Sequence, residues 1–366
     1  MLLKLTYYNT DMLANNVVRK RFDFLDIAKA LTMFCVIWGH ADSGTNNPLY
    51  RCLFYAWTMP LFFLISGIVT KDAKDSDFSF KGWLNFLIKN LFALVLPFII
   101  WGFIFSNFNL PEMYHLLYGS YEQIKIVCAI GALWFLPSFF LARVMSYGIL
   151  NIENKIPFSD RILSLIFGII SIVIGFLLPR VEIGYFFGFN ISFMALGFIL
   201  LGYAMKDIIH IFANQKWWLS LVLFIVFGIS FYFGTAFRGE NFELVSMFKG
   251  SYGNPFWFLL NAFTGSFTII CISILISKFG EKFKNPVNKY LSWVGQNSIG
   301  FYLVHVPIIR QLALPLLENA GFTEPIALVA FVAMLISLVM CSLLVFLINL
   351  VIPQIFGKNC PFEIKK

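Results

Sequence analysis

The sequence predicts an all-α, polytopic integral membrane protein that crosses the bilayer about ten times. Of its 366 residues, 59% are hydrophobic, 19% are aromatic and only 13% are charged, whereas a typical soluble domain has about 25% charged residues. The mean hydropathy is +0.80. Since a soluble domain of this size cannot bury that much apolar surface, the composition excludes a soluble enzyme, a nucleic-acid-binding protein and a disordered scaffold.

Ten apolar stretches are long enough to cross a bilayer, which takes about 20 residues of helix. Several contain proline, which membrane helices tolerate when neighbouring groups satisfy the freed backbone carbonyl. We therefore expect one membrane domain over 23–352, preceded by a tail at 1–22 and followed by a tail at 353–366. The predicted spans are 24–41, 51–70, 84–106, 126–148, 162–179, 184–205, 217–234, 255–277, 291–310 and 326–352.

The distribution of Lys and Arg predicts that both termini are cytoplasmic. With an even number of spans and the N-terminus inside, 20 of the 27 basic residues fall in inside segments and six in outside segments, and Lys29 lies within the first span. Cytoplasmic loops of membrane proteins carry such an excess of basic residues. The net charge of +8 therefore reflects topology rather than a nucleic-acid partner.

The sequence contains no recognisable metal, nucleotide or serine-hydrolase motif. The six cysteines are scattered singly, without a CxxC pair, so neither a disulfide framework nor a zinc site is expected. There is no GxxxxGK[ST], no HExxH and no GxSxG, and their absence weakens the case for an ATP-driven pump. We expect neither a metal nor a bound cofactor.

The first span contains ionisable residues, which are costly in a membrane and by default indicate function. Asp26 and Lys29 are three residues apart on one helix face and can form an ion pair. His40 follows Lys29 by eleven residues, about three turns and a rise of ~16 Å, which places it in the outer half of the membrane. The alternatives are a snorkelling interfacial pair and an interfacial histidine.

A second histidine, His305 in the ninth span, is predicted at the same depth as His40. Each lies about fourteen residues from the inner start of its helix. Two imidazoles at one level are harder to explain by packing than one. A purely structural hydrogen-bonding role for His305 remains the alternative.

Four further polar residues are candidates for substrate contact or for stabilising an oxyanion. Ser66 lies toward the inner end of the second span, where it can also serve helix packing. Trp134 and Asn190 have polar groups in the fourth and sixth spans, and each has a structural alternative. Arg51 lies on the predicted outer side.

Basic residues at the inner ends of several spans can form a cationic mouth for a phosphate-bearing ligand. Besides Lys29, they are Lys89, Arg143 and Lys206. The alternative is that they only reflect the bias of basic residues toward the cytoplasm.

Taken in order, several motifs resemble the membrane acyltransferase 3 family, close to its fucose 4-O-acetylase-like branch. The first is Lys29 followed by ten residues and then His40. The others are MPLFFLISG at 59–67, a basic residue before LxLPF at 89–98, LWFLPSFF at 133–140, LGFILLGYAMK at 196–206 and GQNSIGFYLVHVP at 295–307. Two positions differ from the family pattern: Asn90 follows Lys89 where many members have a second basic residue nearby, and Thr58 precedes Met59 where histidine is common.

The resemblance implies a multi-pass protein of a bacterial cytoplasmic membrane that transfers an acyl group to a sugar hydroxyl. The donor would be acetyl-CoA or another acyl-CoA as co-substrate. The acceptor would be a cell-surface polysaccharide or its undecaprenyl-linked sugar precursor. By resemblance, His40 is the essential histidine, with Lys29 and Asp26 as its catalytic companions.

The chemistry agrees with these residues. An imidazole with a pKa of ~6.5 can take the proton of a sugar hydroxyl as it attacks a thioester, or can itself carry the acyl group. The competing hypotheses are a transporter or flippase for a glycolipid or small anion, and a non-catalytic assembly subunit. The sequence does not determine the oligomeric state.

Overall fold

A computed structural model of the chain describes residues 23–42, 53–128, 131–156, 161–241, 245–283 and 285–361. This part of the chain is all-helical and forms a multi-pass bundle, with no strand among the described residues. The α-helices are α1 (Asp23–Ala41), α3 (Thr58–Ile68), α4 (Phe80–Asn90), α5 (Leu96–Phe105), α6 (Met113–Tyr118), α7 (Tyr121–Val127), α8 (Phe135–Asn154), α9 (Ile162–Leu177), α10 (Phe189–Asn214), α11 (Trp217–Gly234), α12 (Pro255–Phe283), α13 (Pro286–Gln296), α14 (Ser298–Ile308), α15 (Leu314–Asn319) and α16 (Ile326–Val351).

Shorter turns of helix join several of these elements. Two are π-helical, η3 (Leu91–Val95) just before Pro97 and η9 (Ile309–Ala313) just after Pro307. Such widened turns let neighbouring backbone N–H groups bond the carbonyls that proline, which has no N–H, leaves free. The 3₁₀ turns used below are η2 (Ala73–Asp75), η5 (Gly131–Trp134), η6 (Phe186–Gly188), η8 (Met247–Lys249) and η10 (Pro353–Phe356).

All ten predicted spans coincide with helices, but only eight of these helices are long and apolar enough to cross a membrane by themselves. The helices at Leu53–Ile68 and Ile162–Leu177 are shorter. The ninth span begins later than predicted, because the chain breaks at Asn297 into α13 and α14. The amphipathic α13 is therefore a separate element rather than the start of that span.

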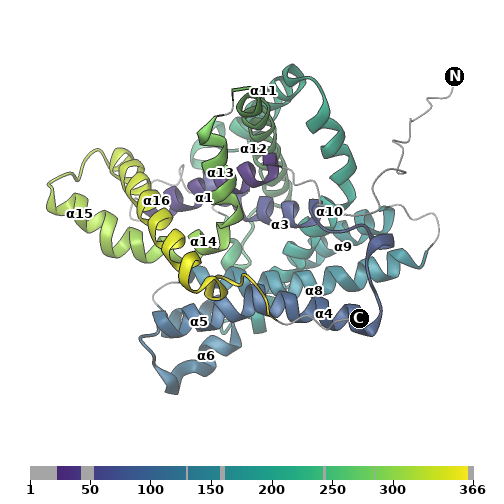
Figure 1. The fold of residues 1–366 in the computed structure, drawn as a ribbon, viewed down its shortest axis with the longest axis horizontal. Coiled ribbons are helices and arrows are strands. Elements are labelled where there is room, and N and C mark those ends of the chain that lie inside the picture. The colour runs from purple at the N-terminus through teal and green to yellow at the C-terminus, as the bar shows by residue number, and fades with distance from the viewer. Residues whose placement is uncertain are drawn as a thin grey trace.

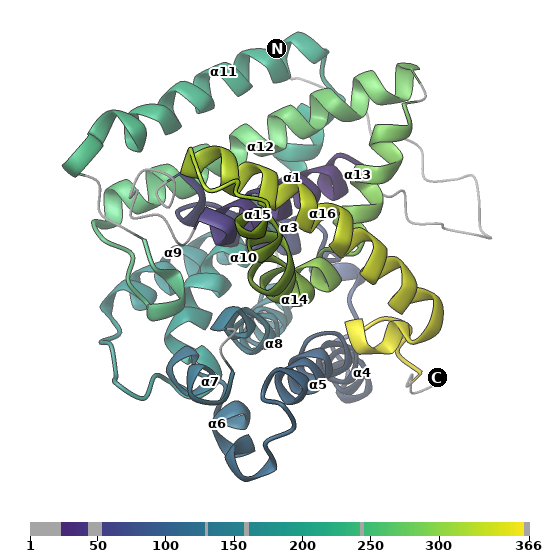
Figure 2. The ribbon, with the colours of Figure 1, turned by 90° about the vertical axis from the view of Figure 1, so that its left-hand side faces the viewer.

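The central helices are α1 and α3, and the periphery is formed by helices with apolar outer surfaces. Figure 2 shows α1 and α3 in the middle of the bundle, while α11 runs along its edge against α12. α11 and α16 are the least buried of the long apolar helices. Their exposed Leu, Ile, Val and Phe side chains provide the surface that lipid would cover.

We name the two ends of the bundle after the two ends of α1. The Lys29 end is where α1 begins, and the His40 end is where it finishes. Because successive long helices run in opposite directions, the segments after α3, α8, α10 and α16 lie at the Lys29 end. The segments after α5, α9 and α11 lie at the His40 end. Figure 1 shows the last described residues close to α4.

The centre of the bundle depends on a close crossing of α3 and α10, which unites two of the predicted motifs. A Cβ atom at Gly67 would lie 1.9 Å from the carbonyl oxygen of Ile199, and one at Gly202 would lie 2.1 Å from that of Leu64. An added side chain at either glycine would force the two helix backbones apart, because they are already in contact. Small residues at such positions let helices approach closely in membranes.

We predict that Gly67→Ala destabilises the protein by about 1–3 kcal/mol, because the added methyl group overpacks a backbone contact. The measurement is the midpoint of thermal unfolding in detergent. Gly148→Ala is the matched control: it lies in α8 with nothing within 4 Å of its Cβ position, and we expect it to be neutral or stabilising by about 0.5–1 kcal/mol. Equal midpoints for the two variants would contradict the close crossing.

The residues after α16 pack against the bundle rather than extending from it. Phe356 of η10 is buried and stacks on Trp101, with ring centroids 5.7 Å apart. The indole N–H of Trp101 donates to the carbonyl of Ile355 over 3.0 Å. The first residues of the predicted tail at 353–366 therefore form part of the bundle, although Phe362 onward lies outside the described residues.

Candidate active site

The two predicted histidines lie side by side at the His40 end of the bundle. Their ring centroids are 4.9 Å apart and the ring planes are inclined by 63°. α1 and α14, which are far apart in sequence, bring them together. His305 is fully buried and His40 is half-buried.

Hydrogen bonding determines which nitrogen of His305 can act as a base. Its Nδ1 lies 2.6 Å from the carbonyl oxygen of Tyr302. A carbonyl oxygen only accepts, so Nδ1 carries the proton in this contact. The buried Nε2 has no hydrogen-bond partner among the described residues and, in the neutral ring, presents a lone pair. A neutral His305 therefore cannot donate a second N–H to an oxyanion.

A cavity of about 300 Å³ extends from Lys29 along α3, α8 and α14 as far as Tyr302. It is narrow and mostly apolar, with aromatic walls from Phe62, Phe135 and Phe139 and with Ser66 and Lys29 toward the Lys29 end. Tyr302 also lines it, and the Tyr302 ring lies 5.6 Å from that of His305 between centroids. The cavity therefore leads from Lys29 to Tyr302, one helical turn before His305, and neither histidine lines it.

Lys29 and Asp26 form the predicted ion pair, with Nζ 2.6 Å from the carboxylate. Gln296 donates to the other oxygen of Asp26 over 3.4 Å. α13 reaches this position because Gly295 has no side chain: a Cβ atom there would lie 1.8 Å from the carbonyl oxygen of Asp26. The ion pair thus borders the cavity, while the contacts of Gln296 and Gly295 with Asp26 hold α13 against α1.

Arg143 lies beside the same cavity, and its guanidinium is hydrogen-bonded to neutral side chains. The guanidinium donates to the hydroxyls of Ser66 over 3.2 Å and Thr70 over 3.0 Å, and to the amide oxygen of Asn90 over 3.4 Å. Within the described segments, no carboxylate contacts it. Arg143 is half-buried, and a cation removed from water without a counter-ion is costly, so an anionic ligand would supply the missing charge.

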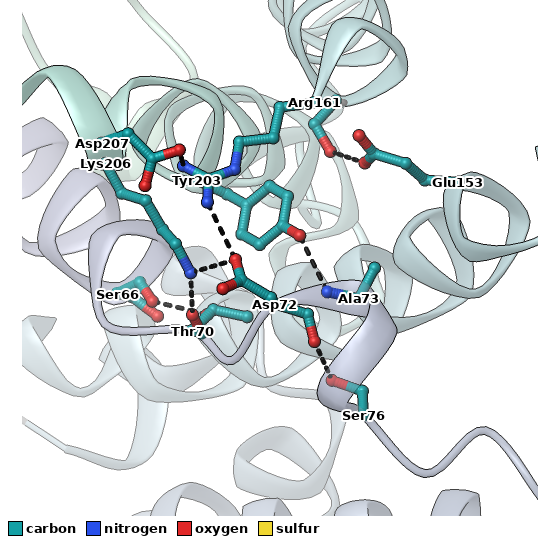
Figure 3. A network of polar contacts seen from close by, with 11 residues as sticks. Ser66, Thr70, Asp72, Ala73, Ser76, Glu153, Arg161, Tyr203, Lys206 and Asp207 are labelled. Carbon is teal, nitrogen blue, oxygen red and sulfur yellow. Dashed lines mark hydrogen bonds and ion pairs between the residues drawn. The ribbon is translucent and has the colours of Figure 1, made fainter. Parts of the chain in front are cut away.

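Lys206 belongs to a closed ionic network rather than to the cavity (Figure 3). Its Nζ lies 2.5 Å from Asp72 and donates to the carbonyl of Thr70 over 3.1 Å. Arg161 bridges the same carboxylate at 2.9 Å and Asp207 at 2.5 Å. Two cations and two carboxylates therefore compensate one another and fasten the segment after α3 to α10.

The electrostatics of Asp72 agree with this structural role. Partial burial by itself would raise the pKa of the carboxyl, but the hydrogen bond and charge of Lys206, together with the charge of Arg161, hold that pKa below its ordinary value. Asp72 is thus ionised at neutral pH. The positive charge of Lys206 is already matched, so Lys206 is a weaker candidate for phosphate binding than Arg143.

Of the remaining predicted site residues, the three that the structure describes do not line the cavity. Lys89 is exposed at the end of α4, next to the Asn90 that holds Arg143. Trp134 is buried in η5 against Phe135. Asn190 lies in a separate pocket at the His40 end, and Arg51 lies outside the described residues.

Three residues that border the cavity were not singled out from the sequence. Tyr302 donates its hydroxyl to the carbonyl of Ala132. Asn297, at the break between α13 and α14, accepts from Lys358 and from Asn349, the latter over 2.8 Å. The GQNS motif at 295–298 was part of the resemblance, but nothing in the sequence indicated that Lys358 would fold back beside it.

These features define a multi-pass membrane protein with an internal cavity bordered by basic residues and with two neighbouring imidazoles at the opposite end of the bundle. The family model described as an acyltransferase domain, acyltransferase 3, matches residues 22–348. The chain therefore belongs to the acyltransferase 3 family and is a membrane protein of the acyltransferase class. A search of curated proteins and a search of solved structures each found no match.

Proposed function

We propose that the protein is a membrane O-acyltransferase that moves an acetyl group, or another acyl group, from acyl-CoA to a sugar hydroxyl. The acceptor is a cell-surface polysaccharide or its undecaprenyl-linked precursor, and the membrane is a bacterial cytoplasmic membrane. The observation that carries the proposal is the cavity that runs from Lys29 and Ser66, the hydrogen-bond partner of Arg143, to Tyr302, whose ring lies 5.6 Å from that of His305 beside His40. Family membership supplies the class of reaction.

The donor would enter from the Lys29 end, which we place on the cytoplasmic side because basic residues are in excess there. The phosphates of CoA would bind at Arg143, whose guanidinium has no carboxylate partner among the described residues. The acyl-pantetheine chain is long, thin and mostly apolar, and it suits a cavity walled by Phe62, Phe135 and Phe139. The thioester would then arrive next to Tyr302 and the histidines.

The reaction follows from the chemistry of a thioester and an alcohol. The acceptor oxygen attacks the thioester carbonyl while the O–H proton passes to the imidazole of His40. The tetrahedral intermediate expels the CoA sulfur, the C–S bond breaks, and the imidazolium returns its proton to the thiolate. The products are the sugar ester and CoA-SH, and no redox partner is needed.

His305 would act as a positioning residue for His40. Its Nδ1–H is committed to the carbonyl of Tyr302, so the lone pair of Nε2 is available to accept an N–H from the neighbouring imidazole. A partner of this kind holds one tautomer of a catalytic histidine and stabilises the imidazolium that forms. We favour direct transfer, because this arrangement prepares His40 as a base.

The decisive experiment is transfer of radiolabelled acetyl groups from acetyl-CoA in membranes that contain the native protein. Glycan and lipid-linked fractions are counted separately, and release of free CoA is measured in parallel. We expect label in a glycan or lipid-linked fraction that depends on the protein. CoA release without labelled glycan would overturn the acceptor class. Neither product, with a proven acetylatable acceptor present, would overturn the transferase and favour a transporter.

A further inference from the structure

A second pocket opens at the His40 end of the bundle, away from the cavity described above. It has a volume of about 240 Å³. Three separate connections build it: the turn before α7, the loop between α9 and α10, and η8. Its lining comprises Ser120, Tyr121, Glu122, Arg180, Val181, Glu182, Gly184, Tyr185, Gly188, Asn190, Ile191, Phe248 and Lys249.

The floor of this pocket is held in place by backbone contacts between the connections. Ser120 caps α7 and donates its hydroxyl to the carbonyl of Ile183 over 2.7 Å. Gly184 has a positive φ of +70°, and a Cβ atom there would lie 2.3 Å from the carboxylate of Glu122. Only glycine fits this approach. The carboxylate of Glu122 therefore packs directly against the backbone of Gly184, next to the Ser120–Ile183 hydrogen bond.

The lining combines aromatic rings with polar groups that the protein leaves unused. Tyr121 packs against Phe248, with ring centroids 4.4 Å apart. Within the described segments, neither the hydroxyl of Tyr185 nor the amide of Asn190 makes a hydrogen bond, and both border the pocket. An aromatic surface next to such groups suits a ligand that has both C–H faces and hydroxyl edges.

The charges of the pocket disfavour a strongly ionic ligand. Two carboxylates, Glu122 and Glu182, and two cations, Arg180 and Lys249, leave no net formal charge. Burial raises the pKa of the Glu122 carboxyl above its ordinary value, although its own backbone N–H and the charge of Lys249 act in the opposite direction. A partly buried carboxylate that faces a pocket gains from a neutral hydrogen-bond donor such as a hydroxyl.

This pocket is connected to the histidine pair through η5 and Tyr302. A Cβ atom at Gly131 of η5 would lie 2.6 Å from the Tyr121 ring, and the carbonyl of the next residue, Ala132, accepts a hydrogen bond from the Tyr302 hydroxyl beside His305. The pocket and the histidine pair also belong to the same end of the bundle. A ligand that rests on Tyr121 is thus on the side from which His40 would be approached, opposite the basic Lys29 end.

We propose that this pocket binds one sugar ring of the acceptor glycan and so selects which sugar is acylated. The ring lies against the aromatic side chains of Tyr185, Tyr121 and Phe248, and its hydroxyls bind the Glu122 carboxylate and the Asn190 amide. A volume of about 240 Å³ accommodates a single hexose and excludes a nucleotide or a folded peptide. The assignment as acceptor site rests on the proposed function, but sugar binding itself does not.

The first test is saturation-transfer NMR on the full-length protein in nanodiscs. The probes are the methyl glycosides of glucose, galactose, mannose, rhamnose and N-acetylglucosamine. We expect at least one of the five to bind. We also expect Tyr185→Ala and Glu122→Gln each to weaken its binding at least tenfold. Tyr114→Ala and Glu112→Gln are matched controls, since both residues belong to the neighbouring turns but do not line the pocket. We expect these controls to bind as the native protein does.

Binding by none of the five glycosides would overturn the proposal, as would equal binding by the pocket variants and the native protein. Glu122→Gln changes only one atom and keeps the size of the side chain, so it remains informative if Tyr185→Ala lowers the unfolding midpoint. Loss of binding in the two control variants as well would also contradict this location.

A kinetic test separates this proposal from the proposed function. In the transfer assay, Glu122→Gln should raise KM for the acceptor at least tenfold. Its KM for acetyl-CoA and the release of CoA without acceptor should be unchanged. If the native protein binds a sugar but never releases CoA, the transferase fails and the sugar site stands. If transfer occurs and the variant leaves the acceptor KM unchanged, the acceptor site fails and the transferase stands.

Discussion

Replacing His40 with alanine is expected to lower kcat for acyl transfer by about 10²–10⁴-fold, the range that general acid–base catalysis supplies. The sugar hydroxyl then has no base to take its proton, while the cavity and its basic end are untouched. KM for acetyl-CoA should change little, since Arg143 and Lys29 are remote from the imidazole. The measurement is the initial rate of transfer at saturating donor and acceptor.

Two further variants sharpen this prediction. His115→Ala removes a histidine of α6 that pairs with Gln123 over 2.5 Å and does not line the cavity, and it should transfer at the native rate. His305→Gln should lower kcat by about 10–100-fold and shift the pH dependence of kcat/KM, because His40 loses its positioning partner. Native rates from both His40→Ala and His305→Gln would remove the histidine pair from the reaction.

Replacing Arg143 with alanine is expected to raise KM for acetyl-CoA by about 10–100-fold, with a smaller effect on kcat. A charge-assisted hydrogen bond to phosphate contributes about 1.5–3 kcal/mol, and here it forms where no carboxylate competes among the described residues. Arg143→Lys keeps the charge but loses the forked geometry, so we expect partial recovery. The measurement is the rate against acetyl-CoA concentration.

The same experiment needs a control for charge and for folding. Arg238→Ala removes a cation that lies over the Trp257 ring at the His40 end, 4.5 Å from its centroid, and should leave KM for acetyl-CoA unchanged. Unfolding midpoints report whether Ser66, Thr70 and Asn90 tolerate the loss of their donor. An unchanged KM in a folded Arg143→Ala protein would contradict donor binding at this guanidinium.

The sequence predicted the helices far better than their ends. Apolar stretches of about 20 residues leave no alternative to helix in lipid, because the backbone must satisfy its own hydrogen bonds. The break at Asn297 was missed although Gln296, Asn297 and Ser298 interrupt the apolar pattern, because three polar residues between two apolar stretches can also lie within one continuous helix. The two shorter helices, α3 and α9, have enough apolar residues around them to look like full spans.

The candidate site was only partly foreseeable. Spacing along the first span paired Lys29 with Asp26, and equal depth suggested that His40 and His305 belong together; both contacts exist in the structure. Lys206 and Arg143 looked alike in sequence, as basic residues at helix ends. Their difference depends on the segments after α3 and α8. Asp72 and Arg161 of those segments form an ionic network with Lys206, whereas Arg143 is hydrogen-bonded to neutral groups.

By itself, the sequence determined that this protein lies in a membrane, that its chain is helical, and which few polar residues had to be explained. Composition and periodicity settle these points because lipid penalises every unsatisfied polar group. The tertiary structure decided that His40 and His305 are neighbours, that Arg143 lacks a carboxylate among the described residues, and that Lys358 folds back beside Asn297. Those properties arise from contacts between segments far apart in the chain, which no local pattern encodes.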